Sequence, residues 1–403
     1  MSTNRLGKKI LKITGYTLGV LAILFLAFHI WFINHAKNIL EESVENKSHG
    51  KLKLKIEKLS YNYFNRRMII KNAVFRTTDT VTAASAYKLG VKEIRLELTA
   101  LLPLIFKKQL SIDSLYLQSP DIEVTTFRNS KNDKDSAKKS HKDISIPYEM
   151  GKVYNSIQEA LQVLQVHRFQ IDDGKFTLIN KEQPGDLPLH INNIHFHIDN
   201  LVVDTGKLTG KEKILFSDNV VFRTSEQDIL FPDGRHRLSF SKFRINLKKR
   251  IVEFDSCTIT ATRTDTSESA FNVFFDALRL TNIDFDTLYR AEVIKADSVY
   301  CVNPKFNLFV AVGKKNEDSK KSPPKLENII KQLTGDLQLN HVVVSNADFN
   351  IITTKDGKPS TFTFSNNNFE MEGLSIDQEA QKPLKVKSFA LAIRNYENFI
   401  KDS

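Results

Sequence analysis

The sequence contains little that could carry out catalysis or hold a metal ion. Of its 403 residues only two are Cys, four are Met and one is Trp. It has no GxSxG, HExxH or Walker-type loop, and no GxGxxG in a strand–helix setting. Cys257 and Cys301 have neither a CxxC partner nor a His at a zinc-like spacing. We therefore expect no enzyme activity, no cofactor and no metal site. The two thiols are expected to be buried in strands or, in an oxidising compartment, paired.

The composition is rich in Phe and in basic residues. Phe occurs 28 times and 41% of the chain is hydrophobic, which predicts a real core and favours strands with aromatic inner faces. The formal net charge is +11. This excess fits attraction to acidic lipid headgroups or polyanions, and it equally fits a solvated, Lys-rich face.

The N-terminal region contains a long uncharged segment. Residues 13–33, ITGYTLGVLAILFLAFHIWFI, carry no formal charge and would span about 30 Å as a helix, the thickness of a bilayer's hydrocarbon core. Residues 1–12 form a basic tail. By the positive-inside rule this tail stays in the cytoplasm, so we expect the rest of the chain to lie on the far side of the membrane that the segment spans. Nucleic-acid binding is not expected there.

A cleaved signal peptide is the rival interpretation of this segment. Its apolar stretch would be only about 7–15 residues and would precede a small-x-small site. Here the apolar stretch is longer and WFINHAKN follows it, which favours an uncleaved transmembrane anchor. Residues 34–50 then predict a short juxtamembrane helix.

Short runs of alternating apolar and polar residues fill the remainder of the chain. Leu52, Leu54 and Ile56 alternate with Lys and Glu, and the same period of two recurs at Ile94/Leu96/Leu98, Ile122/Val124 and Phe176/Leu178. Such runs predict half-buried strands. Separated by turns, they indicate a predominantly antiparallel sheet with one solvated face.

Two stretches break this pattern with helical spacing. They predict helices over 147–164 and 325–335. Each follows a polar, Lys-rich tract, at 128–143 and 313–325, that is typical of a flexible loop.

An internal repeat organises these elements. Segment 94–124 aligns with 278–308 and segment 164–204 aligns with 337–377, both without gaps. The first β repeat covers 51–210 and the second 211–403, where the unit breaks off partway. That ending fits either a short terminal cap or a shortened version of a longer protein.

Four features resemble the AsmA-like family, which includes TamB-like and YhdP-like envelope proteins. They are the N-terminal anchor and three segments: AKNILEESVENKSHGKLKLKIEKL, VKEIRLELTALLPLIFKKQLSIDSLYLQSPDIEV and LQVHRFQIDDGKFTLIN, the last echoed by LQLNHVVVSNADFNIIT. The resemblance covers roughly residues 8–395, and Ala347 departs from it where the first copy has Gly174.

The resemblance implies a mainly β protein with an elongated, curved, taco-like sheet and a few short helices. It also implies a role in outer-membrane and envelope homeostasis, with an apolar groove that holds or conducts phospholipid acyl chains. Alternating apolar positions place these candidates on the groove's inner face: Ile194, Phe196, Ile198, Leu201, Val203, Phe369, Met371, Leu374 and Ile376.

Two alternatives remain open from the sequence. The same side chains would also form the core of a closed sandwich, because alternation does not separate a filled interior from an open one. A non-transporting scaffold, whose sheet edge pairs with a strand of an outer-membrane or periplasmic protein, would show the same pattern. His195 and His197 could bind a metal, but the second repeat has Asn368 and Glu370 there, so we interpret this face as merely polar.

Overall fold

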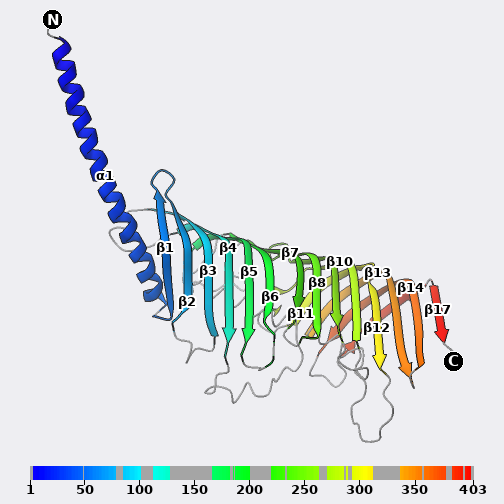
Figure 1. Ribbon diagram of the computed structural model, residues 1–403. Helices are drawn as coiled ribbons and strands as arrows, with labels where there is room; N and C mark the ends of the chain where they lie inside the picture. Colours follow the sequence, from blue (N-terminus) through cyan, green and yellow to red (C-terminus); the bar gives the residue numbers. More distant parts are fainter. Residues whose placement is uncertain are drawn as a thin grey trace.

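A computed structural model shows one long helix followed by one large sheet (Figure 1). It describes residues 3–48, 50–78, 85–100, 112–127, 166–181, 185, 187–199, 219–231, 234–262, 270–285, 287–288, 293–311, 336–355, 358–377, 384–393 and 395–400. The predicted helices 147–164 and 325–335 and the predicted loops 128–143 and 313–325 lie outside these residues.

Helix α1 (Thr3–Lys47) is continuous through the segments predicted as an anchor and as a separate juxtamembrane helix. No Pro occurs in this part of the sequence, so nothing interrupts the helical hydrogen bonds between them. The helix ends where Gly50 takes a positive φ of 76° and donates its amide hydrogen to the Glu45 carbonyl at 2.7 Å. Glycine adopts this backbone conformation without steric cost.

The sheet has 17 strands, mostly of 10 to 20 residues. They are β1 (Leu52–Asn62), β2 (Arg67–Thr77), β3 (Ser85–Leu98), β4 (Ile112–Thr126), β5 (Val166–Asn180), β6 (Leu189–Asp199), β7 (Asn219–Leu230), β8 (His236–Asn246), β9 (Ile251–Ala261), β10 (Ala270–Thr281), β11 (Val293–Val302), β12 (Lys305–Ala311), β13 (Asp336–Lys355), β14 (Lys358–Ile376), β15 (Leu384–Lys385), β16 (Ser388–Ala392) and β17 (Asn395–Ile400).

Most strands pair with the next strand in the chain, so the strands follow one another along the molecule (Figure 1). The exceptions are β11 and β12, which both pair with β10 and β13, and β15, β16 and β17, which all pair with β14. Most pairs are antiparallel, but β4 pairs with β5 in parallel, and β11 and β12 both pair with β13 in parallel. The sheet is therefore predominantly antiparallel, as the sequence pattern predicted, with parallel junctions that the pattern did not indicate. Parallel neighbours need a crossover of about a dozen residues or more. Residues 127–165 and 312–335, which contain the two Lys-rich tracts, make those connections.

The predicted alternation of apolar and polar side chains is confirmed in the strands. In β1, Leu54 and Ile56 are buried whereas the lysines between them are exposed. In β3, Ile94, Leu96 and Leu98 are buried in the same way. The buried side chains form one large cluster from α1 to β10 and a second around β11, β13 and β14, which share half-buried neighbours. One face of the sheet is thus apolar along its length.

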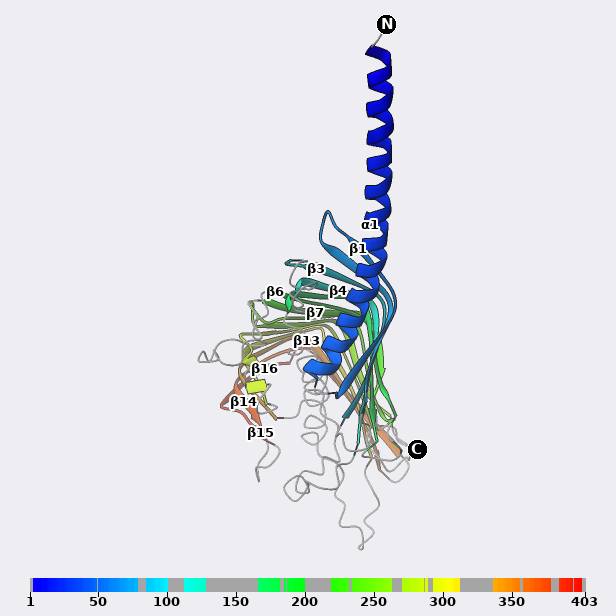
Figure 2. The same ribbon diagram turned by 90° about the vertical axis from the view of Figure 1, so that its left-hand side faces the viewer.

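Eight of the strands turn at one internal residue, and the chain turns in the same way at Asn303, between β11 and β12. These nine residues have φ between 46° and 56°, in the left-handed region that few side chains favour and that Asn and Asp tolerate best. We call them the bend line: Asn72, Ser119, Asp173, Asn193, Glu226, Ser256, Asn303, Asn346 and Asn366. Viewed along the strand order, the sheet is strongly curved (Figure 2).

Each bend keeps the apolar residues on one side. In β5, Phe169 and Ile171 are buried before the bend, Asp173 is exposed at it, and Phe176 and Leu178 are buried after it. Two consecutive residues point outward at the bend, so the alternation shifts by one position and the apolar set stays on the same face. The residue after each bend-line residue is buried in all nine cases: Ala73, Pro120, Gly174, Ile194, Gln227, Cys257, Pro304, Ala347 and Asn367.

These buried positions show that the apolar face is the concave one. A Cβ added to Gly174 would lie 2.8 Å from Ile171 Cγ2 and 3.3 Å from Ile194 Cβ. Side chains converge in this way only on the inside of a bend. We refer to the apolar side as the concave face and to the polar side as the outer face.

The two copies of the internal repeat share this geometry. At the repeat offsets, Ser119 corresponds to Asn303, Asp173 to Asn346, and Asn193 to Asn366, and all six have a positive φ. Each copy also contains one parallel junction, β4–β5 in the first and β11/β12–β13 in the second. The repeat predicted from weak sequence similarity is thus a repeat of backbone conformation and of strand direction.

Gly174 gives a direct test of crowding at the bend line. We expect Gly174→Leu to lower the free energy of unfolding by about 1–3 kcal/mol, because the new side chain must displace Ile171 and Ile194. Gly174→Ala should cost less, since Ala347 occupies the equivalent place in the second copy. Urea unfolding of the detergent-solubilised chain, followed by circular dichroism, measures the difference.

Gly90 in β3 is the matched control, because a Cβ there would meet no atom within 4 Å. Gly90→Ala should change the stability by less than about 0.5 kcal/mol. An equal loss in Gly90→Ala and Gly174→Leu would contradict the assignment of Gly174 to the inside of the bend.

Candidate functional site: the concave face

A ladder of phenylalanines lies across the concave face in the middle of the sheet. The rings of Phe169, Phe196, Phe222 and Phe243 follow one another from β5 to β8, with centroid separations of 6.0, 6.4 and 5.9 Å and edge-to-face tilts. Phe243 then lies 4.4 Å from Phe254 on β9. Such aromatic pairs stabilise one another beyond the area that they bury.

A second ladder lies on the strands of the second repeat. Phe306 on β12 stacks on Phe349 of β13 at 4.7 Å, Phe349 lies 6.0 Å from Phe369 on β14, and Phe369 lies 6.1 Å from Phe389 on β16. Phe196 and Phe369 correspond in the internal repeat and hold the same kind of place in their ladders. Each touches an aromatic ring on both neighbouring strands.

The structure brings most of the predicted groove residues onto this face. Ile194, Phe196 and Ile198 on β6 are 4%, 5% and 0% exposed. On β14, Ile376 is 3% exposed, and Phe369, Met371 and Leu374 are half-buried against the same cluster. Leu201 and Val203 lie outside the described residues.

Sequence reasoning missed most of the phenylalanines in the two ladders. Phe169, Phe243 and Phe254 each lie between two polar residues, which was the available signal, whereas Phe222 follows Val221. The signal was hidden because each strand shifts its alternation at the bend, as β9 does between Phe254 and Cys257. A window that crosses the bend therefore shows no consistent period of two.

The two ends of the concave face differ. At the N-terminal end the last turns of α1 pack against β1 and bury five apolar residues: Phe32, Ala36, Ile39, Leu40 and Val44. At the C-terminal end the apolar side chains of β15, β16 and their flanks are 39–56% exposed: Leu384, Val386, Phe389, Leu391 and Ile393. The apolar lining is thus covered by the helix at one end and accessible at the other.

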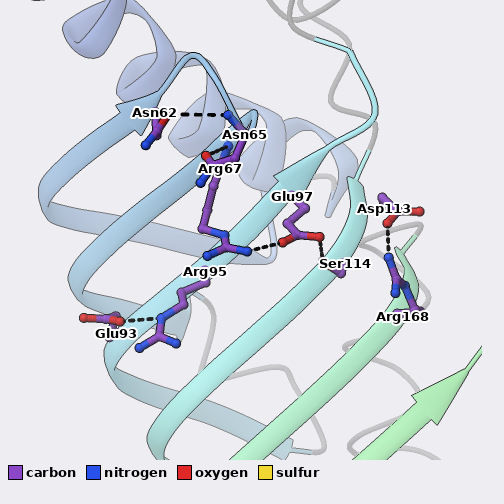
Figure 3. A network of polar contacts seen from close by, with 9 residues as sticks. All are labelled: Asn62, Asn65, Arg67, Glu93, Arg95, Glu97, Asp113, Ser114 and Arg168. Carbon is purple, nitrogen blue, oxygen red and sulfur yellow. Dashed lines mark hydrogen bonds and ion pairs between the residues drawn. The ribbon is translucent and has the colours of Figure 1, made fainter.

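The outer face is covered by cross-strand ion pairs (Figure 3). Near the start of the sheet Arg67 Nη2 lies 2.6 Å from Glu97 Oε1, and Glu97 also accepts a hydrogen bond from Ser114. The bond from Arg67 lowers the pKa of Glu97 below its usual value, so the carboxylate stays charged. Arg168 pairs with Asp113 one strand pair further along. These pairs are half-exposed and add little stability, but they mark this face as solvated.

The two histidines considered as metal ligands lie on the outer face of β6. His195 Nδ1 is 3.2 Å from Asp172 Oδ1, and His197 Nε2 is 2.8 Å from Asp199 Oδ1. Each imidazole thus has its own carboxylate partner on the sheet surface. Over the described part of the chain, no three His, Cys, Asp or Glu side chains are grouped as a metal site would require. Asp284 accepts the Thr287 amide hydrogen at 3.1 Å, and its pKa is lowered by its bonds to Thr287.

The two cysteines are free thiols. Cys257 is buried just after the bend of β9, and Cys301 is half-buried on β11. Burial raises the pKa of both thiols to about 12. Of the two states expected from the sequence, the structure shows the buried and unpaired one.

Scans of the chain against protein-family models and against the curated proteins found no match. The concave face therefore has to be interpreted from its own geometry.

The thiols provide a test of how well this face excludes water. At neutral pH a pKa of about 12 leaves a thiolate population roughly a thousandfold below that of an ordinary cysteine. We expect Cys257 and Cys301 to react with a water-soluble aromatic disulfide only after the chain is unfolded in guanidinium. An added exposed cysteine, Ser241→Cys on the outer face, should react at once. Rapid modification of Cys257 in the folded chain would contradict the burial.

Proposed function

We propose that this protein is an inner-membrane-anchored, AsmA-like envelope protein that holds or conducts phospholipid acyl chains along the concave face of its sheet. The observation that carries the proposal is the apolar concave face, which α1 covers at one end of the sheet and which leaves Phe389 and Leu391 exposed at the other. Acyl chains favour such a surface over water by about 25 cal/mol per Å² of apolar area. The outer face, with its ion pairs, stays in water.

Helix α1 supports the anchored location. Its apolar segment is long enough to cross a membrane, and its side chains between Tyr16 and Trp31 are largely exposed. A core helix of a soluble protein would bury them. A signal sequence meets the same criteria, but the helix continues unbroken into the turns that pack on β1, so the sheet's first cluster depends on it. The basic residues before the segment support a sheet on the far side of the membrane, and the AsmA-like resemblance makes that membrane the inner one and that side the periplasm.

A uniform lining suits movement better than one deep pocket. Each ladder repeats the same aromatic contact from strand to strand, at intervals set by the spacing of about 4.8 Å between strands. A chain that slides by one strand exchanges one set of contacts for an equivalent set. The exposed apolar residues around Phe389 would then be the place where a chain leaves or enters.

A second candidate function is a scaffold that recruits a partner through strand pairing. Two observations favour it. The apolar side chains of β15 and β16 are exposed, and, within the described residues, β16 and β17 each form strand hydrogen bonds with β14 alone, which leaves their other edge unpaired there. A free strand edge can accept a strand of another protein, such as an outer-membrane or periplasmic one.

Bound lipid is the first test. We expect the chain, purified in mild detergent, to retain phospholipid that mass spectrometry detects. Phe196→Arg and Phe369→Arg should reduce the amount of retained lipid about tenfold or more. A tenfold change in affinity corresponds to about 1.4 kcal/mol of binding free energy, and a charged guanidinium in the apolar lining should cost more than that. His197→Arg and Glu370→Arg, on the same strands but on the outer face, are matched controls and should retain lipid.

A photo-reactive residue at Phe389 separates the two candidate functions without changing the core. Phe389 is 56% exposed, so a benzophenone side chain fits there. Cross-linking in intact cells to phospholipid supports the acyl-chain function, whereas a protein adduct without lipid supports the scaffold. The same probe at Tyr300, on the outer face, controls for random contacts. If lipid adducts form equally at both positions, the concave face is not the lipid path.

A further inference from the structure

The turn between β1 and β2 lies beside the apolar part of α1, beyond the point where the helix joins the sheet. Figure 1 shows this hairpin projecting past the other strands toward the N-terminal part of the helix. The ring of Tyr63, in the turn, lies 5.5 Å from that of Phe25, and its hydroxyl is hydrogen-bonded to His29 Nδ1 at 2.9 Å. Phe25 and His29 both precede Phe32, where the buried part of the helix begins.

The depth of Phe25 follows from the position of the basic residues. About 20 Å of helix separate Lys12 from Phe25, at about 1.5 Å per residue. A hydrocarbon core of about 30 Å that starts just after Lys12 therefore extends past Phe25. It cannot start much earlier without burying Lys8, Lys9 and Lys12. A helix that spans the membrane consequently places Tyr63 at the depth of the outer part of the bilayer.

The turn carries the side chains that such a depth requires. Phe64, at its tip, is fully exposed at 101% and has no apolar contact that would explain a phenylalanine there. Tyr63 and Trp31 have amphipathic rings of the kind that gather at membrane interfaces. Arg66, in the same turn, is exposed and donates one hydrogen bond from its guanidinium to the Thr99 carbonyl at 2.8 Å. A cationic group at this level attracts anionic headgroups.

The turn is also held rigidly. Asn62 Oδ1 accepts the amide hydrogens of Phe64 and Asn65 at 3.0 and 3.4 Å, and Asn65 Oδ1 accepts that of Arg67 at 3.1 Å. Arg67 pairs with Glu97 on β3 (Figure 3). The tip is therefore fixed to the sheet and to the helix together, and it does not fold back to cover Phe64.

We propose that the β1–β2 turn, residues 63–66, inserts into the outer leaflet of the membrane that α1 spans, with Phe64 among the acyl chains and Arg66 at the headgroups. It is a second membrane contact beside the helix. Two contacts fix the tilt of the sheet, so that the N-terminal end of the concave face is held at the level of the lipid headgroups. This inference rests on the proposed anchoring of α1, and the experiment below separates the two.

The single tryptophan of the chain makes depth measurements direct. Native Trp31 reports the helix, Phe64→Trp in a Trp31→Phe background reports the turn, and Tyr300→Trp in the same background reports the outer face far from the anchor. All three positions are exposed, so the substitutions leave the core intact. Each protein is reconstituted in phosphatidylethanolamine–phosphatidylglycerol vesicles, with or without lipids brominated near the headgroup end of their acyl chains.

We expect the bromolipids to quench Trp31 and Trp at position 64 strongly, to leave Trp at position 300 unquenched, and to shift the emission of the first two to shorter wavelength. If Trp31 is quenched but position 64 behaves like position 300, the turn does not insert, and the anchor stands. If neither Trp31 nor position 64 is quenched, both the inserted turn and the membrane anchor are overturned.

Discussion

The bend at the middle of the strands is the constraint on which the rest of the structure depends. A left-handed residue turns the chain there, and two consecutive side chains point outward. Without that shift in alternation, the second half of every strand would bring its apolar residues to the outer face. Asn and Asp supply most of these residues because they tolerate the conformation at lower cost than other side chains. Polar bonds along the line, such as Ser119 Oγ to Asp173 Oδ2 at 2.9 Å, join the bends of neighbouring strands.

The inside of the bend imposes a complementary demand. Side chains converge there, so small or compact residues such as Ala73, Gly174 and Ala347 follow the left-handed position. The change from Gly174 to Ala347 between repeats stays within this limit. Larger residues such as Ile194 and Gln227 follow other bend-line residues, so the demand for a small side chain is local to positions such as Gly174, where an added Cβ would lie 2.8 Å from Ile171 Cγ2.

A strand order that follows the chain gives a sheet which grows in one direction, away from the helix. At the two parallel junctions the next strand runs in the same direction as the strand before it, but it is still added on the side away from the helix. One end is covered by α1, and the other exposes apolar side chains around Phe389. Under the proposed function, this polarity gives the concave face one end at the membrane anchor and one end that is open to lipid or protein.

The apolar helix, the mainly β character, the repeat and the alternation of individual strands such as β1 and β3 were predictable from the sequence, because each depends on a local period or a local run. Ile194, Phe196 and Ile198 could be assigned to the inner face for the same reason. The structure has one bent strand, β5, through Asp172 and Asp173, and the alternation on either side of these residues does not show that the strand continues. The parallel junctions, the contact of Tyr63 with Phe25 and the joining of the phenylalanines into ladders depend on pairing between residues distant in the chain. Those pairings are set by backbone hydrogen bonds between strands, which no local period encodes, and so only the tertiary structure determined them.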